Sequence, residues 1–232
     1  MPEAPSPFGF RLAPDAPVDR ILIVGAGGFG REVLQWARDA WPERTSSIAG
    51  FLAADSGHQA GESGGLPILS DPLAFEPRPG DALLLAIGIP ETRRRIAEAL
   101  ERRGAVFLTL VHPTAIVAPT ASIGAGSILC PYSIVSDHCR LGRFVLMNYH
   151  SSVGHDASAA DFCVFSPYAT LGGGAAVGED VFLGLHASVG PHVSLGDRCK
   201  VSAGSTALAS APADTVIWGS PGRHGRRVEI AP

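Results

Sequence analysis

Apolar residues follow two different patterns along this chain. In the first half, short apolar runs alternate with segments in which apolar positions recur at helical spacing. We expect strands at 20–24, 48–52 and 82–87 and helices at 31–40 and 91–103. Strands that alternate with helices predict a small parallel α/β unit, which we assign to residues 19–108, after a Pro-rich, flexible arm at 1–18.

The second half has a period of six. Steps of six from Val117 to Val201 meet fifteen positions, of which thirteen are aliphatic or Met. The next residue is Gly at eight of the fifteen, and the residue four places on is never large. Such hexads suit a narrow three-sided coil with one bulky and one small inward side chain on each face. The pattern predicts a β-helix of about five 18-residue coils, from Val117 to about Ser205, in a domain at 109–232.

Composition and charge narrow the class of protein. The net charge of −4 gives no general attraction to nucleic acid or to an anionic membrane surface. No apolar run is long enough for a membrane span, and residues 1–19 have no apolar core like that of a signal peptide, so we expect a cytoplasmic protein. The four cysteines lack metal-site spacing: Cys139, Cys163 and Cys199 take the small inward position of the hexad, and Cys130 takes a Gly position. We therefore expect no metal.

Several motifs resemble one branch of the hexapeptide-repeat acyltransferases. They are the segment 21–33 with its Gly-rich turn, Val111-His112-Pro113, the segment 148–156, and the closing Gly219-Ser220-Pro221-Gly222-Arg223. Together they resemble the bacterial nucleotide-sugar N-acetyltransferases and sialic-acid O-acetyltransferase-like proteins. That resemblance implies a Rossmann-like α/β domain followed by a left-handed parallel β-helix, a homotrimer, and acetyl-CoA in the groove between neighbouring helices.

The resemblance also implies roles for particular residues. A His followed by an acidic residue is the proposed base of the family, and the pair here is His155-Asp156. The family uses the Asn seven residues earlier, here Asn148, to contact the acceptor. We expect acetyl-CoA to contact Gly173, Ala203 and Arg223. His150 and His186, two coils apart with Tyr168 between them, are expected on one edge and line the trimer groove or serve only as surface residues.

The 18-residue coil gives independent support for His155. Residues 18 apart lie one strand spacing apart, so Gly173 stacks above His155 and Asp137 stacks below it. Gly173 leaves room for a thioester beside the imidazole, and a nearby backbone N–H could hold an oxyanion. An imidazole is largely neutral at pH 7 and can act as a base when a carboxylate orients it. Either Asp156 or Asp137 could be that carboxylate.

The turn after the first predicted strand matches a phosphate-binding pattern. Its residues Gly25, Gly27, Gly28, Phe29 and Gly30 stand between a strand and a helix, where helix N–H groups attract phosphate. A tight turn with close helix packing explains the glycines equally well. Asp55 is the first carboxylate after the second strand, two residues later than the paired carboxylates of the family, and is the candidate contact to the nucleotide.

The favoured function is acetyl-CoA-dependent N-acetylation of a nucleotide-linked amino sugar in surface-glycan synthesis. The favoured acceptor is a 4-amino-4,6-dideoxy sugar. The carrier could be UDP, GDP or dTDP. The same base could instead acetylate a hydroxyl of a sugar or a sialic acid. A third hypothesis is a non-catalytic β-helix scaffold that binds sugar nucleotides, although an inert member would be expected to have lost the His-Asp pair.

Overall fold

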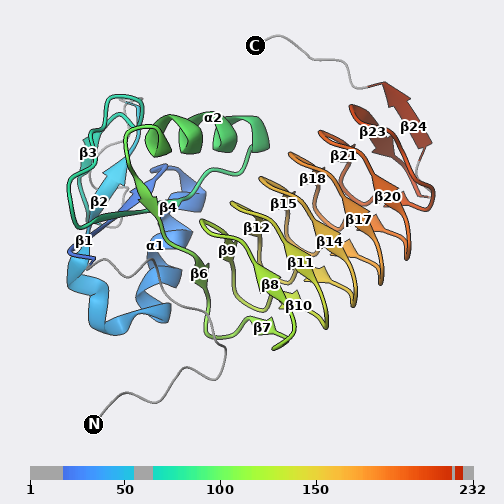
Figure 1. Cartoon of the computed structure of the whole chain (residues 1–232), viewed down its shortest axis with the longest axis horizontal. Coiled ribbons are helices and arrows are strands. Elements are labelled where there is room, and N and C mark those ends of the chain that lie inside the picture. The colour runs from blue at the N-terminus through green and yellow to red at the C-terminus, as the bar shows by residue number, and fades with distance from the viewer. Residues whose placement is uncertain (1–17, 55–64, 221–222, 227–232) are drawn as a thin grey trace.

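The structure is a computed structural model, and it describes residues 18–54, 65–220 and 223–226. An α/β unit forms one end of the molecule, and the remaining chain is a stack of parallel coils that leads away from it (Figure 1). This is the predicted order of a Rossmann-like unit followed by a parallel β-helix. The arm predicted at 1–18 lies, apart from Val18, outside the described residues.

The α/β unit contains a five-stranded parallel sheet with the strand order β3-β2-β1-β4-β5. The central strand β1 and its neighbour β4 are almost completely buried, as their apolar sequences predict. The elements are β1 (Arg20–Val24), α1 (Gly28–Ala40), the 3-10 helix η1 (Pro42–Ser47), β2 (Ile48–Leu52), β3 (Ile68–Ser70), β4 (Asp81–Leu85), α2 (Pro90–Glu101) and β5 (Val106–Phe107).

The first helix begins earlier than predicted. Helix α1 starts at Gly28 rather than at residue 31, because Gly28 and Gly30 of the turn already adopt helical backbone. Gly27 is its N-cap and provides no side chain to cap the first N–H groups. The turn therefore leads directly into a helix whose first donors are available to a ligand.

The coils are built from strands of two residues each. They are β6 (Leu110–Val111), β7 (Ile116–Val117), β8 (Ser122–Ile123), β9 (Ile128–Leu129), β10 (Ile134–Val135), β11 (Arg140–Leu141), β12 (Leu146–Met147), β13 (Ser152–Val153), β14 (Ser158–Ala159), β15 (Val164–Phe165), β16 (Thr170–Leu171), β17 (Ala176–Val177), β18 (Phe182–Leu183), β19 (Ser188–Val189), β20 (Ser194–Leu195), β21 (Lys200–Val201) and β22 (Thr206–Ala207), and the stack ends with β23 (Thr215–Trp218) and β24 (Arg223–Arg226). From Val117 to Val201, the second residue of each strand is the bulky residue of the hexad.

Three sheets form the faces of the coil, and we name each after its first strand. The β6 face has eight strands, the β7 face six and the β8 face five. From β6 to β22, successive strands on a face pair residues 18 apart, as in Ile134 with Ser152 and Leu146 with Val164. The predicted coil length is therefore confirmed, and residue numbers translate directly into height along the stack.

The small inward positions fill the axis of the stack. Cys139, Cys163 and Cys199 lie there fully buried, as predicted. Their thiols face backbone carbonyl oxygens of the next coil, at 2.9 Å from Gly154, 3.0 Å from Gly178 and 3.1 Å from Pro212. These three cysteines belong to the core, and their thiols have hydrogen-bond acceptors there.

Left-handed backbone marks the corners between faces. Between the β6 and β7 faces, four such corner residues stack their rings in a column that we name the Tyr132 edge: Tyr132, His150, Tyr168 and His186. Successive ring centroids are 5.0, 4.9 and 4.6 Å apart. The sequence placed His150, Tyr168 and His186 on one edge, and the structure confirms this.

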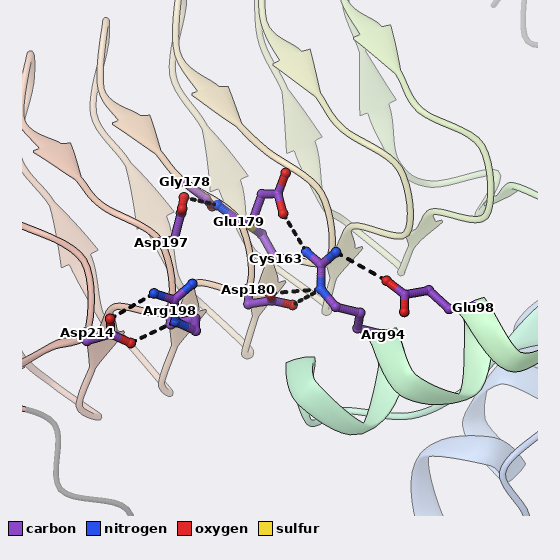
Figure 2. A network of polar contacts seen from close by, with 9 residues as sticks. All are labelled: Arg94, Glu98, Cys163, Gly178, Glu179, Asp180, Asp197, Arg198 and Asp214. Atoms are coloured by element: carbon purple, nitrogen blue, oxygen red, sulfur yellow. Dashed lines mark hydrogen bonds and ion pairs between the residues drawn. The ribbon is translucent and has the colours of Figure 1, made fainter.

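Helix α2 anchors the α/β unit to the corners between the β8 and β6 faces. Arg94 Nε lies 2.9 and 3.0 Å from the two carboxylate oxygens of Asp180, and Nη2 lies 2.7 Å from Glu179 (Figure 2). The same guanidinium stands 4.3 Å above the ring of Phe162. These contacts hold α2 against corners of two successive coils.

A second arginine of α2 is buried at this junction. Arg93 has no exposed surface, and its guanidinium donates to the carbonyl oxygens of Leu85 at 2.8 Å, Ile87 at 2.6 Å and Phe144 at 2.9 Å. Burial lowers the pKa of Arg93 to about 9, which leaves it a cation at neutral pH. The end of β4 and a corner of the β-helix are thus joined through one side chain.

Neither helix among the described residues is long and apolar enough to cross a membrane.

Candidate active site

His155 and Asp156 form the corner that follows β13, on what we name the His155 edge, between the β7 and β8 faces. His155 Nδ1 lies 2.8 Å from Asp156 Oδ2, and the two side chains are 68% and 67% exposed. Because a carboxylate only accepts hydrogen bonds, this contact favours the proton on Nδ1 and leaves the lone pair of Nε2 free. That orientation is the one a general base requires.

Asp137 lies one coil below His155, as the stacking predicts, but its carboxylate is engaged elsewhere. One oxygen accepts a hydrogen bond from the hydroxyl of Thr120, and the other lies 2.8 Å from His138 Nδ1. These two hydrogen bonds lower the pKa of Asp137. Of the two carboxylates considered for orienting His155, the structure brings only Asp156 into contact with the ring.

Gly173 lies directly against the imidazole of His155. A Cβ built on Gly173 would stand 2.6 Å from Nε2 and 2.7 Å from Cε1, so the imidazole itself occupies the space that a side chain would fill. Room for a thioester therefore has to lie beyond the ring rather than in the place of the missing side chain. The N–H of Gly173 donates no hydrogen bond to another described residue, whereas its carbonyl accepts one from His192 N.

The glycines of the first turn divide into two pairs with different environments. A Cβ on Gly25 would stand 2.5 Å from the carbonyl oxygen of Ala86, and one on Gly30 would overlap the carbonyl of Gly25, so these two are needed for packing. Gly27 and Gly28 face open space, apart from the guanidinium of Arg31 near Gly28. The turn is therefore consistent with both close packing and phosphate binding. Gly25 and Gly30 allow the close packing, and Gly27 and Gly28 leave the start of α1 open for phosphate.

A cavity of about 380 Å³ lies between the start of α1, the loop after β4 and the β-helix. Asn148 lines it from the β-helix, with its Oδ1 held at 2.8 Å by the N–H of Tyr149. Phe29 and Glu32 line it from α1, and the volume is in the range of small-molecule sites. The remaining lining residues are Gly88, Ile89, Leu146, Tyr149, Val164, Ser166 and Phe182.

The structure does not bring all the predicted residues together within one chain. Asn148 follows β12 and His155 follows β13, so they stand at opposite ends of one strand, on different edges. Ala203, like Asn148, lies at a corner between the β6 and β7 faces, beside the Tyr132 edge, and Gly173 lies on the His155 edge. Arg223 is exposed at the start of β24, and Asp55 lies outside the described residues.

Sequence reasoning missed Glu32 as a site residue. Glu32 stands on the exposed side of a regular helix, and nothing in its spacing separates it from a solvated charge. Its position becomes informative only once α1 is docked on the β-helix. Among the described residues, no group of three or more His, Cys, Asp or Glu side chains is arranged to hold a metal ion.

Comparisons with known proteins agree with both halves of this architecture. Residues 20–100 match the family model of the PglD N-terminal domain. Over 144 residues the chain is 27% identical to the GDP-perosamine N-acetyltransferase of Escherichia coli O157:H7, across 62% of this chain and 65% of that protein. The alignment thus spans less than two thirds of the curated relative.

Solved structures extend the likeness to the whole fold. A mutant of perosamine N-acetyltransferase from Caulobacter crescentus, in complex with CoA and GDP-perosamine, has a TM-score of 0.81 and 25% identity, over 91% of this chain and 99% of that one. The fold of this chain is therefore similar to that of a perosamine N-acetyltransferase. The acetyltransferase domain of PglB from Neisseria gonorrhoeae FA1090, in complex with acetyl coenzyme A, matches this chain with a TM-score of 0.78 and 26% identity, over 89% of this chain and 98% of the PglB domain.

Proposed function

We propose that this protein transfers an acetyl group from acetyl-CoA to the amino group of a nucleotide-linked 4-amino-4,6-dideoxy sugar. The observation that carries the proposal is the corner at His155, where Asp156 orients the imidazole against Gly173. The relatives named above support an amino-sugar acceptor, and their substrate favours GDP as the carrier. The cytoplasmic location predicted from the sequence remains part of the proposal.

The transfer is direct and needs no acyl-enzyme. The neutral amine attacks the thioester carbon while Nε2 of His155 takes the proton from the amine nitrogen. Negative charge then develops on the carbonyl oxygen, where the N–H of Gly173, which donates to no other described residue, can stabilise it. When the carbon–sulfur bond breaks, the imidazolium returns the proton to the thiolate of CoA. Asp156 stabilises the imidazolium between these steps.

The separation of Asn148 from His155 supports an oligomer, and we propose the homotrimer that the family resemblance implies. In a trimer of parallel β-helices, the Tyr132 edge of one protomer can face the His155 edge of the next. The acceptor residues of one chain would then meet the base of its neighbour, and Ala203 would approach the acetyl-CoA groove from the opposite side to Gly173. Arg223 is the proposed contact to a CoA phosphate.

A nucleotide site at the open turn completes the proposal. Gly27 and Gly28 expose the first N–H groups of α1, to which the diphosphate can bind, while Gly25 and Gly30 keep the turn closed. Phe29 lines the cavity that leads from this turn to Asn148. Asp55 remains the proposed contact to the nucleotide base or ribose.

The test is the release of free thiol from acetyl-CoA across UDP-, dTDP- and GDP-linked 4-amino sugars, with the hydroxyl analogues and free sialic acid alongside. We expect turnover on one nucleotide-linked amine. Turnover only on hydroxyl acceptors would establish O-acetylation instead, and the absence of all turnover and of CoA binding would support the scaffold. Sedimentation that shows a monomer at micromolar concentration would contradict the trimer.

A further inference from the structure

The cavity between the two halves has mostly apolar walls. Ile89, Leu146, Val164 and Phe182 contribute apolar surface, and Asn148 and Ser166 contribute neutral polar groups. Among the described residues that line the cavity, Glu32 is the one with a carboxylate. A ligand in this space therefore meets one acidic side chain against an apolar background.

Glu32 is not committed to another side chain. Within the described part of the chain, its carboxylate forms no hydrogen bond or ion pair. The guanidinium of its neighbour Arg31 lies near Gly28, with Nη2 3.9 Å from the position of a Cβ on that glycine. Glu32 is exposed overall but lines the cavity, and burial there raises the pKa of its carboxyl group against the opposing charge of Arg31.

The charges on the first turns of α1 are thus divided between two sites. A cation and open N–H groups stand at Gly28, where an anion can bind, and an anion stands in the cavity. Two negative groups repel each other strongly in a partly enclosed space, so a phosphate is disfavoured beside Glu32. The part of the ligand that enters the cavity must instead be neutral or cationic and must offer N–H or O–H donors.

We infer that Glu32 recognises the hexose of the nucleotide sugar by accepting hydrogen bonds from its hydroxyl or amino groups. This inference rests on the proposed function, because it takes the nucleotide-linked sugar as the ligand. The hexose lies between Glu32 on α1 and Asn148 on the β-helix, and the apolar wall faces its deoxy carbon. Glu32 is a specificity-determining residue of the acceptor, and it makes no contact with the nucleotide or with acetyl-CoA.

The experiment separates the hexose from the nucleotide. Glu32→Gln removes the charge at nearly constant shape, and Glu43→Gln, on the exposed 3-10 helix η1 away from the cavity, is the matched control. Calorimetry measures binding of GDP, UDP and dTDP and of their 4-amino-4,6-dideoxyhexose conjugates, and thiol release gives the KM for each substrate. For the nucleotide that the wild type binds, we expect Glu32→Gln to lower the affinity for the sugar conjugate at least tenfold. The affinity for the nucleoside diphosphate and the KM for acetyl-CoA should stay within twofold of wild type.

Three outcomes would overturn the inference. Equal loss of affinity for the nucleoside diphosphate and its conjugate would place Glu32 at the nucleotide or in the fold. Unchanged affinity for both would show that the carboxylate touches neither. The same loss in Glu43→Gln would show a nonspecific effect of charge. Failure of the proposed function looks different, because the wild type would then turn over no amino sugar, and the role of Glu32 would be decided by the calorimetry alone.

Discussion

Replacing Gly173 with Ala tests whether the ring of His155 has to lie where the structure places it. A Cβ at residue 173 would stand 2.6 Å from Nε2 and 2.7 Å from Cε1. Ordinary contacts between such atoms begin at about 3.4 Å, so the imidazole must move by about 0.8 Å. Gly173 is not among the glycines with positive φ, so its backbone accepts Ala and the ring takes the whole displacement.

The expected loss follows from this displacement. A shift of about 1 Å in a reacting group costs about 100-fold in rate, which corresponds to about 2.7 kcal/mol in the activation free energy. The free energy of unfolding should change by less than about 0.5 kcal/mol, because the displaced side chain is exposed and can move into solvent. A large rate effect with a small stability effect is thus the expected signature.

The assay is thiol release from acetyl-CoA at saturating acceptor, together with denaturant unfolding of each variant. Gly190→Ala is the matched control, since it changes an equivalent corner where the nearest atom to a new Cβ is 3.3 Å away and no histidine is touched. We expect that control to stay within about twofold of wild type. The double variant Gly173→Ala/His155→Ala should be no slower than His155→Ala, because both changes act through one ring. A Gly173→Ala rate within threefold of wild type, or additive losses in the double variant, would refute this reasoning.

Three further predictions concern charged and titratable side chains. His155→Ala should bind both substrates with unchanged KM and lose about 100- to 10,000-fold in kcat, and steady-state activity within tenfold of wild type would exclude a base role. Asp156→Asn should lower kcat about tenfold or more while Asp137→Asn stays within threefold, and the reverse order in the same assay would assign ring orientation to Asp137. Burial acts to raise the pKa of Asp81, but the hydrogen bonds from Arg20 at 2.8 Å and from the N–H of Arg78 at 3.0 Å, together with the charges of both arginines, outweigh it and lower that pKa. These interactions therefore stabilise the fold above about pH 4, and the stabilisation is lost as pH falls through the lowered pKa. Asp81→Asn should lower the free energy of unfolding by roughly 1–3 kcal/mol at pH 7 and flatten its dependence on pH below 4. If denaturant unfolding at several pH values gives the wild type and the variant the same dependence of unfolding free energy on pH, the role of this ion pair is contradicted.

The β-helix could be predicted because its rule is local and repeats. Each hexad places one bulky residue inward, and the 18-residue register puts Gly173 above His155 and Asp137 below it. Stacking fixes backbone positions, however, and does not choose side-chain rotamers. The carboxylate of Asp137 turns to His138 at its own corner and to Thr120 one coil below, and that choice depends on neighbours that a period of six does not describe.

The junction between the two halves could not be predicted from either pattern. Arg93 occupies the apolar side of α2, with Ile96, Ala97 and Leu100, but one arginine in a charged helix gives no sign that it will be buried. Its acceptors are backbone carbonyls from β4, the loop after it and the corner at Phe144, which meet only after docking. The cavity beside Glu32 forms at the same junction, so it appears only in three dimensions.

The stack of coils also makes length an adjustable property of the molecule. Each coil in the stack pairs only with the coils directly above and below it. Adding or removing one coil of 18 residues on the C-terminal side of Gly190 would therefore move β23 and Arg223 by one strand spacing, about 4.8 Å. His155, Asp156 and Gly173 lie in lower coils and would keep their positions. Evolution can therefore change how far the C-terminal end reaches without rebuilding the corner at His155.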